Sequence, residues 1–197
     1  WMMGAFRLLA KLKRLRGTAF DVFGYGEDRK FERRLIAGYE ARIAEILERL
    51  NRFYIHNINF TTFVTVFLAR FDPNERTLTY VNSGHNPPAV FCRSGASVTW
   101  LKRTAPAIGL AEHYFPMTET LSLSEGDILL LYTDGLTEAL NNEMEQFGQE
   151  RLAEFVQNAA DLSASEMLRV VRQGVSAHGE DVPLSDDLTL VAMKVLG

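Results

Sequence analysis

Aspartates stand at three places in the sequence where a predicted strand meets a turn. Asp134 follows the apolar run 128–132, Asp21 precedes a glycine-containing loop, and the pair Asp186-Asp187 precedes the last apolar segment. A carboxylate at the mouth of a buried strand is costly unless something positive compensates it. Carboxylate oxygens are the ligands that Mg²⁺ and Mn²⁺ prefer, whereas zinc sites usually contain cysteine or histidine clusters, which this chain lacks. Convergence of these carboxylates would therefore suit one or two Mg²⁺ or Mn²⁺ ions.

Each of these features also has an ordinary structural interpretation. Asp-Gly is a frequent turn sequence, so Asp134-Gly135 taken alone is more typical of a turn than of a metal site. His85, in the rigid loop 83–88, could be a metal ligand or a general acid. A loop histidine hydrogen-bonded to the backbone is the favoured interpretation, because histidine has many non-catalytic uses. Other features of the sequence are needed to distinguish a metal site from these ordinary structural roles.

The composition bounds the class of protein. The chain has 197 residues, of which 47% are hydrophobic and 23% are charged, enough for a globular domain with a sizeable core. The net charge of −4 does not favour nucleic acid as a partner, and no apolar run approaches the ~20 residues of a membrane span. The single cysteine, Cys92, excludes an intrachain disulfide and fits a reducing compartment, so we expect a cytoplasmic protein. Its strand-like surroundings predict a buried structural thiol.

Sequence periodicity predicts an alternation of strands and helices around these aspartates. The basic segment 1–17 could be an amphipathic helix on a membrane, but its mixed spacing favours a hairpin of 2–9 and 12–22. Apolar residues recur at helical spacing from Asp28 to Leu50, and 51–59 would be the following connection. A capping box of Ser163 and Glu166 starts a later helix. The remaining predicted elements are strands at 62–71, 77–82, 89–93, 97–101, 128–132 and 188–196, and helices at 149–160 and 163–175.

Five motifs occur in an order that resembles a known family. They are Tyr80–Pro88, Ile108–Leu110, Leu130–Ala139, Phe147–Gly148 and Asp186–Leu190. This order is similar to that of the bacterial metal-dependent serine/threonine phosphatases of the PPM class, in the branch of sporulation stage II protein E. Members of this branch act in sigma-factor partner-switching pathways. The resemblance runs from about Leu47 to the C-terminus, roughly three quarters of the chain.

The resemblance implies an α+β fold, a four-layer α-β-β-α sandwich of two packed antiparallel sheets with helices on the outer faces. It also implies a two-metal site at one end of the sandwich, between the sheets. By motif position Asp134 and Asp186 would bind one ion, and Asp21 would bridge both ions with the Val22 carbonyl as a further ligand. No side chain would act as the catalytic nucleophile, because a metal-bound water would attack phosphorus. The resemblance does not identify substrate-binding residues.

The chain departs from this family at its N-terminal end. The first glycine loop usually reads Asp-Val-Ser/Thr-Gly-His-Gly, and here it reads Asp-Val-Phe-Gly-Tyr-Gly over residues 21–26. The family's Gly-Gly-Asp segment, which supplies an acid to the second ion, would lie just before Trp1 and is not in this sequence, and the stretch 26–50 is shorter than the usual two helices. We therefore expect residues 1–197 to form a single domain that lacks N-terminal residues and part of the helical region after residue 26.

The sequence predicts a phosphatase that hydrolyses phosphoserine or phosphothreonine on a regulatory protein of the anti-sigma-factor antagonist type. Phe23, Tyr25 and the missing acid favour an alternative, a pseudophosphatase that keeps the fold as a protein-binding module. A membrane-surface module using the basic N-terminus is a third hypothesis. The predicted partners include neither nucleic acid nor a membrane span, and a homodimer is compatible with the sequence.

Overall fold

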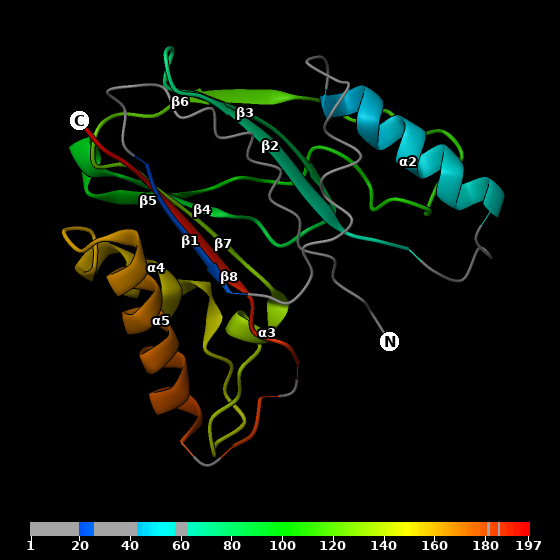
Figure 1. The fold of residues 1–197 in the computed structure, drawn as a ribbon. Helices are drawn as coiled ribbons and strands as arrows, with labels where there is room; N and C mark the ends of the chain where they lie inside the picture. Colours follow the sequence, from blue (N-terminus) through cyan, green and yellow to red (C-terminus); the bar gives the residue numbers. More distant parts are fainter. Residues whose placement is uncertain (1–19, 26–42, 58–62, 181, 185) are drawn as a thin grey trace. The chain divides into compact units, whose positions relative to one another are not determined.

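The computed structural model describes residues 20–25, 43–57, 63–180, 182–184 and 186–197, with only the backbone described for 20–25 (Figure 1). The predicted N-terminal hairpin up to residue 19, and residues 28–42 of the predicted helix 28–50, lie outside these residues. The chain divides into two compact units. The described residues of the first unit are 43–57, 63–87 and 102–122, and those of the second are 20–25, 88–101 and 123–197 with the gaps given above. In the part of the chain described, no helix is both long and apolar enough to cross a bilayer.

The first unit is a three-stranded antiparallel sheet with one described helix. The strands are β2 (Val66–Asp72), β3 (Thr77–Ser83) and β6 (Glu119–Ser122), in the order β2-β3-β6, and the helix is α2 (Ile43–Asn57). The predicted hairpin of β2 and β3 is confirmed. In its turn the Asp72 carboxylate accepts the backbone N–H groups of Asn74 and Glu75, as expected of an Asp-Pro-Asn turn. The core of this unit is formed by Leu47, Leu68, Val81, Ala105, Ile108 and Tyr114.

Helix α2 extends beyond its predicted end. The polar residue Asn51 was expected to begin a connection, but the helix continues to Asn57. Asn51 is 2% exposed, and its amide donates to the Ala111 carbonyl at 2.9 Å and accepts the Gly109 N–H at 2.8 Å. A buried amide is tolerated in a helix when a neighbouring loop satisfies it in this way. The sequence prediction failed because the loop partner is about 60 residues away along the chain.

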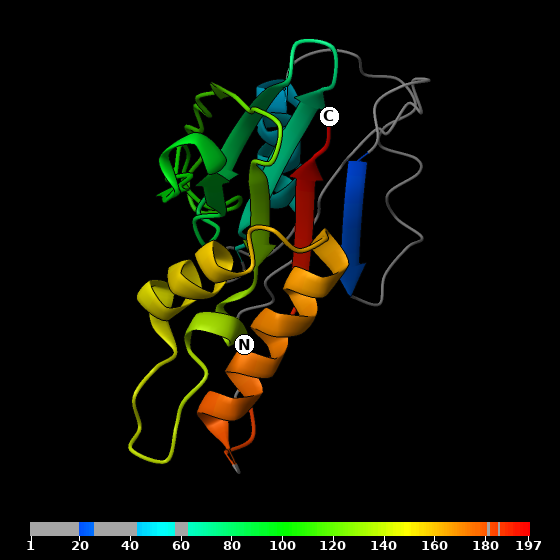
Figure 2. The same cartoon turned by 90° about the vertical axis from the view of Figure 1, so that its left-hand side faces the viewer.

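The second unit is a five-stranded antiparallel sheet in the order β1-β8-β7-β4-β5 (Figures 1 and 2). Its strands are β1 (Phe20–Tyr25), β4 (Ala89–Cys92), β5 (Ser97–Trp100), β7 (Ile128–Tyr132) and β8 (Leu190–Val195). All five residues of β7 are buried, which confirms the central strand expected from the run of apolar residues. A short 3-10 helix, η1 (Arg93–Gly95), joins β4 to β5.

The described residues of the second unit form three α-helices: α3 (Asp134–Thr137), α4 (Gly148–Asn158) and α5 (Ala164–Gly179). Alternate residues of the central strands, among them Ile128 and Leu130, pack in one core with Leu152 and Val171 of α4 and α5. These two helices therefore cover one face of the sheet (Figure 2). The predicted capping box at the start of α5 is confirmed, but the helix runs one turn past its predicted end near Val175.

The cysteine is only partly buried. Cys92 ends β4 and its thiol is free. Burial, and secondarily the negative charge of Asp127, raises the pKa of this thiol above its usual range. A thiol that stays protonated is a poor nucleophile, as expected of a structural residue.

Candidate metal centre

The end of β7 and the start of β8 lie at the same edge of the five-stranded sheet. The two strands are antiparallel, and the last pair between them is Tyr132 with Leu190. Asp134 lies two residues past this pair on one chain segment, and Asp186 lies four residues before it on the other. Figure 1 shows α3, whose first residue is Asp134, at this edge. The fold thus brings two of the predicted ligands to one place.

Thr133 joins the two segments directly. Its backbone N–H donates to the Thr189 carbonyl at 3.1 Å. Its hydroxyl donates to the Asp187 carbonyl at 2.8 Å and accepts the Thr189 N–H at 2.9 Å. The residue is 6% exposed, so water competes poorly for these bonds. Thr133 is not among the residues predicted from the sequence, although a hydroxyl residue between an apolar run and an aspartate can be recognised there.

Gly135 brings the same two segments into contact. A Cβ atom at this position would lie 2.7 Å from the Asp187 carbonyl oxygen and 2.9 Å from that of Asp186. Gly135 lies in α3, so the glycine is needed here for close approach of two backbones and not for the sharp turn expected from the sequence. Only a residue without a side chain allows the Asp186-Asp187 backbone to reach the start of α3.

Local hydrogen bonds orient the two carboxylates. Asp134 is half-buried, and its Oδ1 atom accepts the Gly135 N–H at 3.1 Å. Asp186 is exposed, and its Oδ1 atom accepts the Asp187 N–H at 2.7 Å. The Asp134 carbonyl in turn accepts the Glu138 N–H at 2.9 Å, which closes the single turn of α3. Each acid is therefore held relative to its own backbone, and Thr133 and Gly135 fix the two backbones relative to each other.

The donor chemistry of this pair fits a hard divalent ion. Mg²⁺ in proteins is typically held by one or two carboxylates and keeps several waters, which two aspartates at an exposed edge would permit. Over residues 43–57, 63–180 and the described part of the C-terminus, no group of three His, Cys, Asp or Glu side chains is arranged to hold a metal. Asp134 and Asp186 are the two predicted ligands whose side chains the structure describes, and their role as metal ligands stays a prediction.

The structure does not bring Asp21 to this edge. In the β1–β8 register Tyr25 pairs with Leu190, whereas Asp21 pairs with Lys194. Four residues along a strand correspond to about 13 Å. For Asp21 and the Val22 carbonyl to reach Asp134, β1 would have to shift by about four residues along β8, an even number that keeps each side chain on the same face. The role of these two residues stays a prediction.

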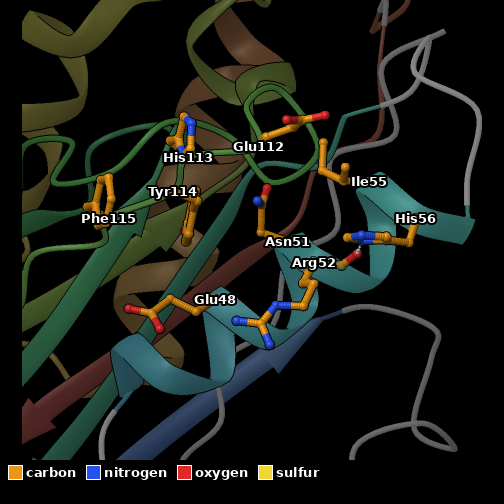
Figure 3. Close-up of a pocket in the computed structure, with 9 residues that line it drawn as sticks. All are labelled: Glu48, Asn51, Arg52, Ile55, His56, Glu112, His113, Tyr114 and Phe115. Carbon is orange, nitrogen blue, oxygen red and sulfur yellow. Dashed lines mark hydrogen bonds between the residues drawn. The ribbon is translucent and has the colours of Figure 1, made fainter.

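His85 lies in the other unit. It is buried, its backbone N–H donates to the Asn82 side chain at 2.8 Å, and Nδ1 lies 3.2 Å from the Thr65 hydroxyl. His85 is therefore a hydrogen-bonded loop histidine, as the sequence favours, and its partners include the side chains of Thr65 and Asn82. The same unit contains a cavity of about 390 Å³ between α2 and the segment 112–115 (Figure 3). None of the predicted metal ligands lines it.

Comparison with known proteins places this sequence and fold in a class. The sequence of residues 30–196 matches the family Stage II sporulation protein E (SpoIIE), and residues 1–58 match a family of unknown function. Two antiparallel sheets with helices are the α+β fold of the PP2C-type phosphatases of the PPM class. The chain belongs to the SpoIIE family of this class. Asp21 and Val22 lie outside the residues matched by that family.

Curated relatives agree with this assignment. Protein IcfG of Synechocystis sp. is 33% identical over 132 residues, which are 66% of this chain and 20% of that protein. The phosphoserine phosphatase RsbU of Bacillus subtilis is 24% identical over 151 residues, 77% of this chain and 44% of RsbU. The chain therefore spans less than half the length of either relative.

Solved structures show the same fold at low sequence identity. The SiaA-PP2C domain of Pseudomonas aeruginosa superposes with a TM-score of 0.67 at 22% identity, covering 77% of this chain and 60% of that one. RsbX in complex with magnesium gives a TM-score of 0.60 at 13% identity over 94% and 90% of the two chains. The manganese-soaked phosphatase domain of SpoIIE from Bacillus subtilis gives 0.56 at 14% identity, over 92% and 88%.

Proposed function

We propose that this chain is the catalytic domain of a metal-dependent phosphatase that hydrolyses phosphoserine or phosphothreonine on a regulatory protein. The observation that carries the proposal is the contact of Thr133 and Gly135 with the Asp186-Asp187 backbone, because it joins two acids that are 52 residues apart in sequence. The similarity to RsbU, a phosphoserine phosphatase, supports the substrate class. A regulatory protein of the anti-sigma-factor antagonist type is the proposed partner.

In this proposal Asp134 and Asp186 bind one Mn²⁺ or Mg²⁺ ion. Bound ions of this kind activate water and offset negative charge on a phosphoryl group. The contribution of the chain is to position the two carboxylates: Asp134 on the single turn of α3, and Asp186 on the segment that leads into β8. Asp21 and the Val22 carbonyl are proposed to complete a second ion site, which requires the shift of β1 described above.

The test is the Mn²⁺ dependence of phosphate release. The 197-residue chain is assayed with p-nitrophenyl phosphate and with a phosphorylated antagonist protein, with and without Mn²⁺. Asp134→Ala should abolish the Mn²⁺-dependent rate. Asp161→Ala is the matched control, because Asp161 is an exposed acid of the same unit that pairs with Arg93 at the surface. A wild-type rate no higher than that of Asp134→Ala would rule out the proposed activity.

A catalytically impaired binding module is the second candidate. Two observations favour it: Asp21 pairs with Lys194 rather than lying near Asp134, and the first loop carries Phe23 and Tyr25 in place of a small hydroxyl residue and a histidine. Calorimetric titration with Mn²⁺ separates the two functions. Tight binding of two ions per chain would favour the phosphatase, whereas binding of one ion or none, with no phosphate release, would favour the binding module.

A further inference from the structure

Thr133 stands where the chain changes from strand to helix. The pairing of Tyr132 with Leu190 makes Thr133 and Thr189 the next pair of the β7–β8 ladder. A hydrogen-bonded antiparallel pair exchanges two N–H···O bonds. One of them is present, from the Thr133 N–H to the Thr189 carbonyl at 3.1 Å. The return bond does not go to the Thr133 carbonyl, because that oxygen accepts the Leu136 N–H at 3.1 Å in the first turn of α3.

The hydroxyl of Thr133 makes the return bond instead. The Thr189 N–H donates to this oxygen at 2.9 Å, so the ladder continues for one pair although the main chain has already turned into α3. The same hydroxyl donates its own proton to the Asp187 carbonyl at 2.8 Å. Its donor and its acceptor are therefore both used, and both partners belong to the segment that carries Asp186. Valine has nearly the same shape as threonine and can make neither bond.

We propose that Thr133 is a positioning residue for the metal ligands: its hydroxyl fixes the segment of Asp186 against the start of α3, which carries Asp134. This inference rests on the proposed function, because it assigns the pair Asp134 and Asp186 to one ion. Asp134 follows Thr133 directly, and Asp186 is bonded through its Oδ1 atom to the N–H of Asp187, whose carbonyl Thr133 binds. Loss of the hydroxyl would remove two of the three hydrogen bonds that Thr133 makes to the segment of Asp186, and would so loosen Asp186 relative to Asp134. Groups that orient metal ligands in this way typically contribute a factor of about 10 to 100 to metal affinity.

The matched control is a buried threonine in the other unit. Thr104 is 7% exposed, and its hydroxyl accepts the Asn82 N–H at 3.1 Å. Thr104→Val removes a buried hydroxyl of similar environment without touching the acids. Thr133→Ser keeps the hydroxyl of Thr133 and removes only its methyl group.

The experiment is calorimetric titration of Mn²⁺ into the 197-residue chain and these three variants. Thr133→Val should weaken Mn²⁺ binding about 10- to 100-fold, whereas Thr133→Ser and Thr104→Val should bind close to the wild-type affinity. Wild-type affinity in Thr133→Val would overturn the inference and leave the proposed function standing. An equal loss in Thr104→Val would also overturn it, because the effect would then follow from general destabilisation.

A second measurement does not depend on the folding of any variant. In amide hydrogen exchange of the metal-free wild type, the Thr189 N–H should be as strongly protected as the ladder amides of β8, because it donates a hydrogen bond to the Thr133 hydroxyl. Fast exchange at Thr189 would overturn the inference. If the wild type binds no Mn²⁺, the proposed function and the positioning role both fall, and protection at Thr189 then shows that Thr133 links the segments for structural reasons alone.

Discussion

A methyl group on Gly135 would lie 2.7 Å from the carbonyl oxygen of Asp187, a distance that real Cβ atoms do not tolerate. The opposing group is backbone, held by the Thr133 hydroxyl, so it cannot swing aside as a side chain would. We therefore expect Gly135→Ala to destabilise the fold by about 1–3 kcal/mol, the usual cost of overpacking, and to weaken Mn²⁺ binding. Urea unfolding of the metal-free chain measures the first effect and calorimetry the second.

The control for this substitution is Gly179→Ala. Gly179 ends α5, and a Cβ atom there would meet the Leu140 carbonyl oxygen at 3.5 Å, an ordinary contact. Alanine favours the helix, so this variant should be neutral or slightly more stable than the wild type. Equal stability of Gly135→Ala and the wild type would contradict the close approach seen in the structure.

The two acids before β8 should differ in their effect on metal binding. Asp186 is the proposed ligand, whereas the part of Asp187 that the site uses is its carbonyl oxygen. At 100 times its dissociation constant a bound ion raises the free energy of unfolding by about 2.7 kcal/mol. We expect Asp187→Ala to keep this Mn²⁺-dependent increase and Asp186→Ala to lose it, as read from thermal unfolding with and without Mn²⁺. The opposite result would assign the ligand to Asp187.

A buried carboxylate elsewhere in the second unit holds a turn in place. Asp127 is 5% exposed and accepts the backbone N–H groups of Ser124 and Arg93, each at 2.8 Å. Asp127→Ala leaves two N–H groups without this acceptor. Each of them that stays unsatisfied lowers the free energy of unfolding by about 1–3 kcal/mol. We expect a lower urea midpoint with an unchanged Mn²⁺ affinity, because the turn lies at the other end of β7 from Asp134. A change in metal affinity would show that the turn and the acids are coupled.

The sequence pattern was sufficient to predict an element of the fold wherever the interactions that determine this element are local. The five apolar residues of β7, the Asp72 turn and the capping box at Ser163 are each decided by neighbours within a few positions. It was not sufficient where the structure depends on a partner that is distant in the sequence. Helix α2 continues through Asn51 because residues 109–111 bind its side chain, and Gly135 is a glycine because of Asp187. The same holds for the site, since Thr133 acts on residues more than 50 positions away.

The capping box of α5 should make stability depend on pH. Ser163 donates its hydroxyl and its N–H to the Glu166 carboxylate, and these bonds lower the pKa of Glu166 below its ordinary 4.5. A lowered folded-state pKa stabilises the fold above pH 4.5, and this contribution is lost as the pH falls through the lower value. Ser163→Ala should therefore lower the melting temperature more at pH 7 than at pH 3. An equal loss at both pH values would show that the charge of Glu166 takes no part.

Asp21 is the residue whose role depends most on the position of β1. In the observed register it pairs with Lys194, about 13 Å along the strand from the pair of Tyr25 and Leu190. If β1 keeps this register, we expect Asp21→Ala to leave the affinity of the first Mn²⁺ ion, at Asp134 and Asp186, within about twofold of wild type, because solvent-exposed charges more than about 10 Å apart are largely screened at 0.1 M salt. Calorimetry gives both the affinity and the number of ions. A tenfold loss, or the disappearance of a second ion, would support the shift of β1 along β8 on which the proposed second ion site depends.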